Sequence, residues 1–524
     1  MRPRFAVLYL LWMLSLIACT APQATALSPA TAPTLSATAL PTLIPTAAPT
    51  LTPPPSPTPV PTFAAGSTIG GVDVAGLTLA VAEQRVSAAL ADLVRPLELR
   101  VGEERLTLEP EAIELQLPIA AMLEQAASAL AADTAVDLPL EASFDPASLR
   151  VAIEDLAAQV AVPAELSVLS ATDELSRTFA YTPGLTLDVD RAVKAVAGRL
   201  ADLKAKGPLT LKLAEDPTTP QVSKERLQAE IEALAATWKG VTGLYLYDLQ
   251  NGEELEYNAK SVFAGASTIK VAIMLNAYAN LPKFTSRQEF WMGEMIRYSD
   301  NLSANDLLSA AAGGTGTDYA FSGANEMSAL LAELGLKNTY LYVPYESGDY
   351  IAANKVKYKC GPKDPVGPKP YTETGCALRT TPYEMAQVYR QIDACAKGEG
   401  TLSADYKLLT TKRCQEMLNR LATNADKKRF VFGLPKGTRV EHKSGWIENM
   451  QADVGIIRSP GGDFVLAVYL YRKLPKGVYL WDDAYVAPYL GAFAGLAYSA
   501  YNPLKITDCK LQIADCQPER SVAP

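Results

Sequence analysis

The spacing of hydrophobic and polar residues changes several times along the chain. Residues 5–17 form a short apolar run, and residues 20–63 consist almost entirely of Ala, Pro, Thr, Leu and Ser. From residue 66 onward, apolar residues recur every three or four positions in some segments and every second position in others, which predicts helices and strands respectively. The pattern therefore predicts an α+β protein preceded by a segment that lacks the residues to build a core.

Residues 66–215 contain an internal sequence repeat. Each half has the sequence GLTL, then a helical pattern that ends in LADL, then the alternating pattern of a strand. The three blocks lie at 76–79, 90–93 and 97–101 in the first half and at 184–187, 200–203 and 209–213 in the second. We therefore expect a small α+β module built from two similar halves.

Residues 222–505 show the same two spacings of apolar residues, helical and strand-like, over a larger region. The expected elements are a helix over 224–238 and strands over 243–248, 454–457 and 464–470. Asn251-Gly252 follows the first strand and is a hairpin turn signal. We expect one large domain here, separated from the preceding module by the hydrophilic, proline-bearing break at 215–220.

The overall composition is that of a globular protein. Hydrophobic residues make up 48% and charged residues 20% of the 524 positions, which excludes a wholly disordered chain and a multi-span membrane protein. The formal net charge of −9 argues against a partner held through its phosphates, so we expect no nucleic acid. The single histidine, His442, cannot build a histidine-rich metal site, and we expect neither a metal nor another cofactor.

The first residues have the pattern of an export signal. Two arginines precede the apolar run, which is too short to span a bilayer comfortably and ends in small residues. The sequence LIAC at 16–19 resembles the lipobox of bacterial lipoproteins, which implies cleavage before Cys19 and a lipid anchor on this residue. Residues 1–18 would then be the signal peptide, and the proline-rich residues 19–65 a disordered linker on the outer face of the cytoplasmic membrane, in the cell envelope. The alternative is an ordinary secretory signal in which Cys19 is incidental.

Cysteine usage agrees with export. Apart from Cys19 the chain has six cysteines, and an even number outside a reducing compartment favours disulfides. No C-x-x-C spacing supports a zinc site. Six thiols leave the pairing open, although pairing between sequence neighbours closes the shortest loops. The expected pairs are Cys360–Cys376, Cys395–Cys414 and Cys509–Cys516, the last of them in the short tail at 506–524.

Three short motifs carry side chains suited to nucleophilic catalysis. Ser267 and Lys270 lie three positions apart at the start of a predicted helix, so their side chains share a face. A buried lysine with a depressed pKa could accept the serine proton. The other two motifs are Ser299-Asp300-Asn301, before a helical pattern, and Lys443-Ser444-Gly445, before two strands. Alone, Ser267 and Lys270 are more typical of a helix cap and a surface lysine, Ser299-Asp300-Asn301 of a helix cap, and Lys443-Ser444-Gly445 of a common tripeptide. All three motifs in this order are far more specific.

Together these motifs resemble the three motif sets of class A β-lactamases and penicillin-binding proteins. The sequence TTPYEMA at 380–386 also resembles the segment that closes the Ω loop of class A enzymes. The resemblance covers residues 222–505 and implies an antiparallel sheet with helices on both faces, together with a helical subdomain. It implies a serine hydrolase that acts through an acyl-enzyme on β-lactams or on D-Ala-D-Ala peptides of the cell wall.

The resemblance assigns catalytic roles to three side chains. Ser267 would be the acylated nucleophile, and Lys270 would assist its deprotonation. Ser299 would relay a proton towards the leaving nitrogen. The backbone N–H groups of Ser267 and Trp446 would form an oxyanion hole.

It also assigns residues that bind the substrate. Asn301 would hold the side-chain amide of the substrate, and Lys443 and Ser444, followed by Gly445, would bind its carboxylate. His442 adjoins Lys443 in a predicted strand, so its side chain should point to the opposite face of the sheet. We therefore expect His442 to be structural.

Two departures from the class A pattern bear on the function. Ser299 follows Ser267 by only 32 positions, far fewer than in class A enzymes, so we expect a more open site. The E-x-x-x-N motif that supplies the deacylating glutamate is also missing, and Glu346 and Glu373 are the two glutamates between 342 and 379 that could serve as a base. Without this glutamate, deacylation would be slow. The alternative function is a non-hydrolytic or slowly acylated penicillin- or peptidoglycan-binding lipoprotein that tethers or senses.

The module at 66–215 has a resemblance of its own. The sequence IGGVDVAGLT at 69–78 resembles the opening of the peptidoglycan-binding domain found beside VanW-type and L,D-transpeptidase modules, and PGLTLDV at 183–189 resembles its closing half. This implies peptidoglycan as a partner. The alternative is a spacer that lifts residues 222–505 away from the membrane.

Overall fold

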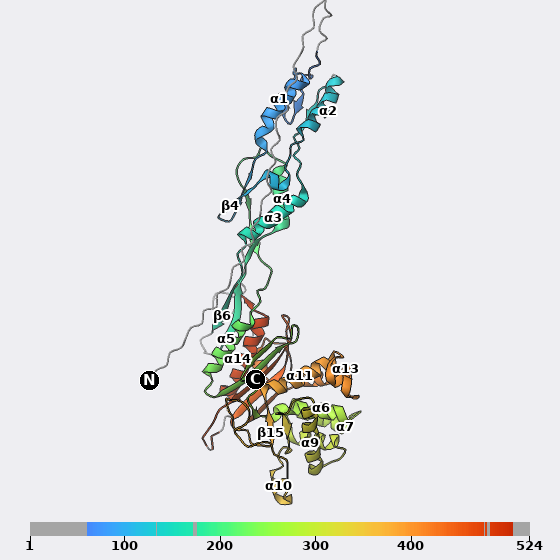
Figure 1. Cartoon of the computed structure of the whole chain (residues 1–524), viewed down its shortest axis with the longest axis vertical. Coiled ribbons are helices and arrows are strands. Elements are labelled where there is room, and N and C mark those ends of the chain that lie inside the picture. Colours follow the sequence, from blue (N-terminus) through green and yellow to red (C-terminus); the bar gives the residue numbers. More distant parts are fainter. Residues whose placement is uncertain (1–59, 133, 171–174, 476, 479–482, 507–524) are drawn as a thin grey trace, which may run out of the picture. The chain divides into compact units, whose positions relative to one another are not determined.

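The computed structural model describes residues 60–506 except 133, 171–174, 476 and 479–482 (Figure 1). The expected signal peptide, Cys19, nearly all of the expected linker and the pair Cys509–Cys516 lie outside the described residues. The described chain from Pro61 onward belongs to one compact unit. Within these residues, no helix combines the length and the hydrophobicity needed to cross a bilayer.

The first part of the N-terminal module is a small core between two helices and a three-stranded sheet. Its elements are β1 (Thr68–Ile69), β2 (Val72–Asp73), α1 (Leu79–Leu90), α2 (Ile119–Ala131) and β5 (Asp137–Leu138), with sheet order β2-β1-β5. Phe63 is buried in this core, and its backbone N–H donates to the carbonyl of Leu77. The ordered module therefore begins at the end of the proline-rich segment.

The second part of the module brings the two halves of the internal repeat together. Its elements are β3 (Leu97–Val101), β4 (Glu104–Leu108), α3 (Pro146–Val160), β8 (Leu185–Leu187), α4 (Val189–Leu200), β9 (Leu209–Leu211) and β10 (Leu213–Glu215). Strand β3 follows α1 and strand β9 follows α4, as the repeated pattern predicts. These two strands are neighbours and run parallel, with Leu99 opposite Leu209. Strands that run parallel start at the same edge of a sheet, so the connections that precede them meet there.

One hairpin of the sequence-defined module packs against the following domain. It consists of β6 (Glu165–Ser170) and β7 (Arg177–Thr182), and β7 pairs in parallel with β19 (Leu504–Lys505) near the other end of the chain. Phe179 is fully buried, and its backbone N–H donates to Ser499 Oγ at 3.0 Å. The side chain of Arg177 also forms an ion pair with Glu230. The hydrophobic pattern of residues 165–182 could not predict this pairing, because β19 lies more than 300 positions later in the sequence.

A five-stranded antiparallel sheet forms the centre of the larger domain. Its order is β12-β11-β18-β17-β16, with β11 at Val241–Asp248, β12 at Glu254–Tyr257, β16 at Arg439–Ile447, β17 at Met450–Arg458 and β18 at Phe464–Tyr471. Helices α5 (Lys224–Thr237) and α14 (Asp483–Tyr501) pack on one face, and α6 (Lys270–Asn280) and α11 (Pro382–Ala396) pack on the other (Figure 1). The expected α+β architecture, with helices on both faces of an antiparallel sheet, is confirmed.

Further helices extend the face that carries α6 into a helical subdomain. They are α7 (Ser286–Arg297), α8 (Asn301–Ala311), α9 (Thr317–Glu333), α10 (Gly348–Asn354), α12 (Gly400–Asp405) and α13 (Thr411–Leu421). A small sheet of order β13-β15-β14 lies beside them, with β13 at Phe263–Ala264, β14 at Tyr340–Leu341 and β15 at Leu378–Thr380. The disulfides Cys360–Cys376 and Cys395–Cys414 confirm two of the three expected pairs.

Candidate active site

The candidate nucleophile lies in a tight turn between a strand and a helix. After β13, a 3₁₀ turn at Ala266–Ile269 leads directly into α6, so Ser267 stands one turn before this helix begins. Ala266 has a φ of +43°, a region that costs a non-glycine residue free energy and is found mostly where surrounding contacts enforce it. The hydroxyl of Tyr345 donates to the carbonyl of Ala266 at 2.9 Å and supplies one such contact.

Lys270 is fully buried and reaches the residues predicted to surround it. Its Nζ lies 3.1 Å from Ser267 Oγ, 3.2 Å from Ser299 Oγ and 2.7 Å from Asn301 Oδ1, and it also donates to the carbonyl of Ser299. Burial and the nearby ammonium group of Lys443 lower the pKa of Lys270 to about 7. A large fraction of this amine is therefore neutral near neutral pH and able to accept a proton.

Ser299 lies between two amines. Its Oγ is 3.0 Å from Lys443 Nζ and 3.2 Å from Lys270 Nζ, and its backbone has a φ of +63° at the end of the α7–α8 connection. Lys443 is also buried, and burial lowers its pKa to about 8 although Asp453 and Asp426 favour its charged form. The Ser299 hydroxyl can therefore exchange a proton with either Lys270 or Lys443.

Strand β16 brings the third motif against the nucleophile turn. A side chain at Gly445 would place its Cβ 2.8 Å from the backbone nitrogens of both Ser267 and Thr268, so only glycine permits this approach. Strand β16 is the last strand in the sheet order, and Trp446 on it is 47% exposed. The oxyanion hole formed by the backbone N–H groups of Ser267 and Trp446 stays a prediction.

The structure separates the two candidate deacylation bases. Glu346 lies at the site, where its Oε1 accepts from Asn301 Nδ2 at 2.8 Å. Asn301 therefore joins Lys270 and Glu346, because its other amide atom accepts from the lysine. The structure shows no contact between Glu373 and these residues: its carboxylate pairs with Lys473 at 2.7 Å, two positions after β18 ends.

A second asparagine explains how Glu346 reaches the site without the expected motif. Asn305 of α8 donates to the carbonyl of Tyr345 at 2.8 Å and accepts from its N–H at 3.0 Å. These two hydrogen bonds attach the backbone before Glu346 to α8. The ring of Tyr345 also lies 4.7 Å from Lys270 Nζ. The sequence pattern gave no signal for Tyr345, and Asn305 was visible only as part of a helical pattern.

His442 and Lys443 point to opposite faces of β16, as predicted. His442 is buried and its Nδ1 lies 2.9 Å from Asp453 Oδ1, on β17. Asp453 also accepts from the backbone N–H of Phe430 at 3.1 Å. The histidine thus lies in the packing between the sheet and the segment before β16, and its structural role stays a prediction.

A cation that the sequence did not single out lies near Ser444. Arg429 is 2% exposed, pairs with Asp426 at 2.6 Å, and stacks its guanidinium 4.6 Å from the ring of Trp446. Burial would raise the pKa of Asp426, but Arg429 and a hydrogen bond from Ser444 hold it at about 2. The face of β16 near Ser444 therefore carries a fixed ion pair. No spacing rule could have placed Arg429 here.

Comparison with known proteins agrees with this geometry. A family model described as the β-lactamase enzyme family matches residues 226–285 and 289–482. The chain carries a β-lactamase-like domain. The matched residues include all three motifs, and the antiparallel sheet with a helical subdomain is the β-lactamase/transpeptidase-like fold expected from the sequence. No curated protein gives a significant match to this chain.

Several solved structures are similar over the same domain. A PBP-A mutant, solved as an acyl-enzyme complex with penicillin G, has 20% identity and a TM-score of 0.39, covering 54% of this chain and 99% of its own. An ancestral class A β-lactamase has 19% identity and a TM-score of 0.37, covering 52% of this chain and 99% of its own. The assignment of the fold rests on the family match and the sheet topology rather than on these scores.

Proposed function

We propose that residues 222–505 form a serine hydrolase that acts through an acyl-enzyme on β-lactams or on D-Ala-D-Ala peptides. The observation that carries this proposal is the contact between Ser267 Oγ and the Nζ of Lys270, a buried lysine whose pKa is lowered to about 7. A positioned general base typically accelerates a reaction by about 10²–10⁴-fold. The part of the chain that the structure describes holds no cluster of three His, Cys, Asp or Glu suited to a metal ion.

In the acylation step, neutral Lys270 accepts the proton of Ser267 as Oγ forms a bond to the substrate carbonyl carbon. The carbonyl oxygen becomes an oxyanion, which the N–H groups of Ser267 and Trp446 would stabilise by about 3 kcal/mol each. The C–N bond then breaks, and the hydroxyl of Ser299 delivers its proton to the leaving nitrogen. Ser299 recovers a proton from Lys270, with Lys443 beside it at 3.0 Å.

The substrate carboxylate would lie against Lys443 and Ser444. The guanidinium of Arg429 adds positive charge close to Ser444, which favours an anionic group at this end of the site. Asn301 would contact the side-chain amide of the substrate with its second N–H, because the first already donates to Glu346.

Glu346 is our proposed base for deacylation. Its carboxylate, joined to Lys270 through Asn301, would accept a proton from the water that attacks the ester carbonyl. The second candidate function, a slowly acylated binding protein, is favoured by the lack of an E-x-x-x-N motif, since Tyr350 stands four positions after Glu346. The two functions differ in the rate of acylation and in the lifetime of the acyl-enzyme.

The test is intact-mass spectrometry of the full chain during incubation with a penicillin. An adduct that forms and disappears while product accumulates indicates hydrolysis, and an adduct that persists indicates the binding function. Ser267→Ala should give no adduct, whereas Ser322→Ala, at an exposed serine of α9, should behave like the parent. An adduct in Ser267→Ala, or none in the parent at any time, would contradict the proposal.

We also propose that the chain is exported and lipid-anchored at Cys19. The two described disulfides support an oxidising compartment. Expression in a lipoprotein-processing bacterium should give a mature protein that partitions into detergent, and Cys19→Ala should abolish this partitioning. Peptidoglycan binding by residues 66–215 stays a prediction, which a sedimentation assay with insoluble peptidoglycan would check.

A further inference from the structure

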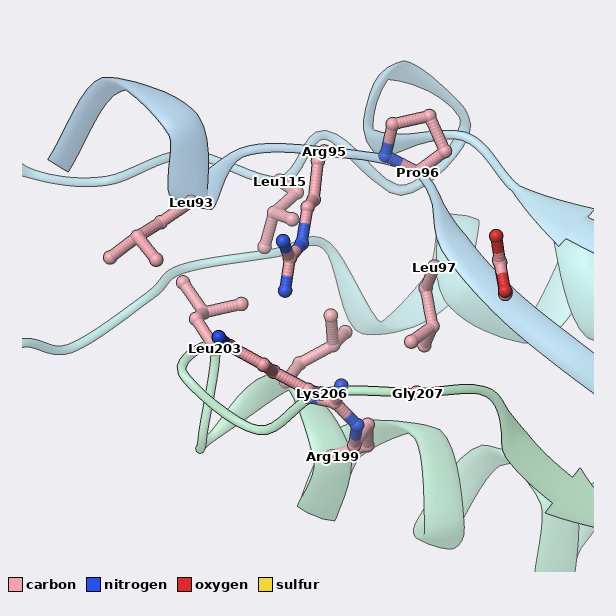
Figure 2. Close-up of a pocket in the computed structure, with 11 residues that line it drawn as sticks. Leu93, Arg95, Pro96, Leu97, Leu115, Arg199, Leu203, Lys206 and Gly207 are labelled. Carbon is pink, nitrogen blue, oxygen red and sulfur yellow. The ribbon is translucent and has the colours of Figure 1, made fainter.

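The N-terminal module contains a cleft where the two halves of its internal repeat meet. Because β3 and β9 are parallel neighbours, the connection from α1 to β3 and the connection from α4 to β9 lie at the same edge of their sheet. They enclose a cavity of about 300 Å³ (Figure 2). Each connection supplies one leucine and one cation: Leu93 and Arg95 from the first, Leu203 and Lys206 from the second.

The charges in this cleft are unbalanced. The side chains of Arg95 and Lys206 reach into the same space from facing segments (Figure 2). Neither makes a hydrogen bond or an ion pair with any other residue that the structure describes. Glu98 is the only carboxylate among the lining residues, against three cations, in a chain whose net charge is −9. Two like charges that point into one cavity repel each other until an anion lies between them.

The third cation, Arg199, supports the shape of the cleft. Its guanidinium donates to the carbonyl of Asp202 at 2.8 Å and to that of Ala205, so it holds the turn that leads to Lys206. Its remaining positive charge still contributes to the potential in the cavity. The position of Lys206 is thus set by a braced turn.

Part of the cavity wall is aliphatic. Leucine side chains from both connections and from the neighbouring elements line it, at positions 93, 97, 115, 200 and 203. Where leucines line the wall, they exclude water on one side and strengthen the attraction between the cations and an anion. They also provide a contact for an apolar group next to that anion.

We propose that this cleft binds a phosphate monoester whose neighbouring group is apolar. A phosphate monoester carries close to two negative charges at neutral pH, which matches the two unpaired cations, whereas a carboxylate would neutralise only one of them. The planar fork of Arg95 suits two phosphate oxygens, and the ammonium of Lys206 serves as a point charge for the third. This site is independent of the hydrolase function and should persist in Ser267→Ala.

The test is calorimetric titration of the full chain with phenyl phosphate at low salt. Benzoate and phenol, with the same ring and one or no negative charge, serve as ligand controls. We expect saturable binding of phenyl phosphate, at least tenfold tighter than that of benzoate. The double variant Arg95→Gln/Lys206→Gln should weaken phenyl phosphate binding by at least tenfold.

Arg100→Gln/Lys212→Gln is the matched control, because it removes two exposed cations from the same module outside the cleft. This variant should bind phenyl phosphate like the parent, and thermal melting should show that both variants fold. The proposal is overturned if Arg95→Gln/Lys206→Gln binds like the parent, if both double variants lose affinity equally, if benzoate binds as tightly, or if no saturable binding occurs.

Discussion

The catalytic centre and the cleft of the N-terminal module both gather cations, but they do so in opposite environments. Lys270 and Lys443 are fully buried, and each has several fixed polar partners within 3.2 Å. Arg95 and Lys206 are exposed and have no such partners among the described residues. Burial of an amine disfavours its charged form.

This difference separates chemistry from binding. A lysine with a pKa of about 7 can exchange a proton with a serine during a reaction, because both of its protonation states are populated. Exposed cations without fixed partners are suited instead to holding an anion. This contrast supports the two proposals, reaction at the centre and recognition at the cleft, and four experiments can break or sharpen it.

The largest effect is expected from removing the buried base. Lys270→Met should lower the rate of acylation by a penicillin about 10³-fold, because Ser267 then has no proton acceptor within contact distance on α6. A fluorescent penicillin and gel-based kinetics would measure this rate. Lys283→Met, at an exposed position after α6, is the matched control and should leave the rate within twofold. A loss below fivefold in Lys270→Met would mean that another group is the base.

A smaller effect, on a different step, is expected at Glu346. Glu346→Gln should slow deacylation about 10²-fold and leave acylation nearly unchanged, because the amide keeps a contact with Asn301 but cannot accept the proton of water. Time-resolved intact mass would separate the two steps. Glu373→Gln should change neither step, since this carboxylate pairs with Lys473 away from the centre. Equal effects of the two variants would remove Glu346 from the mechanism.

The pH dependence of acylation tests the buried pair as a unit. Below about pH 7 Lys270 is protonated and cannot accept a proton, so the rate should fall about tenfold per pH unit. Above about pH 8 Lys443 loses the charge that holds the substrate carboxylate, so the rate should fall again. Lys443→Arg should remove the alkaline limb alone, because guanidinium does not titrate in this range. A flat profile between pH 5 and 9 would show that neither lysine has the lowered pKa.

The smallest effect is expected from salt, and it separates the two regions directly. Raising NaCl from low to high ionic strength should weaken phenyl phosphate binding at the exposed cleft several-fold, because mobile ions screen exposed charges. Acylation should change less than twofold, since Lys270 and Lys443 are buried and less accessible to screening. Calorimetry and acylation kinetics in the same salt series would measure both. Equal sensitivity would contradict the contrast between the two environments.

The sequence by itself determined the parts of this protein that depend on short spacings. Period and turn signals predicted the strand that became β11 and its hairpin at Asn251-Gly252, and they also predicted β17 and β18. The i, i+3 spacing predicted that Ser267 and Lys270 would share a face, and the resemblance to class A β-lactamases implied that Ser299 and Lys443 would join them; the structure places all four in contact. Short loops also predicted two disulfides correctly. For the strands, the hairpin and the disulfides, neighbours in the sequence determine the geometry, whereas the meeting of the three motifs was expected from the family resemblance alone.

Only the tertiary structure decided which distant residues meet. Glu346 reaches Asn301 because Asn305 attaches the preceding backbone to α8. Glu373, on the same connection between β14 and β15, pairs with Lys473 instead. The pairing of β7 with β19 and the meeting of Arg95 with Lys206 likewise depend on how strands far apart in the sequence come together. Local patterns fix helices, strands and turns, but the closure of the chain depends on the packing of whole elements, which no short window of sequence contains.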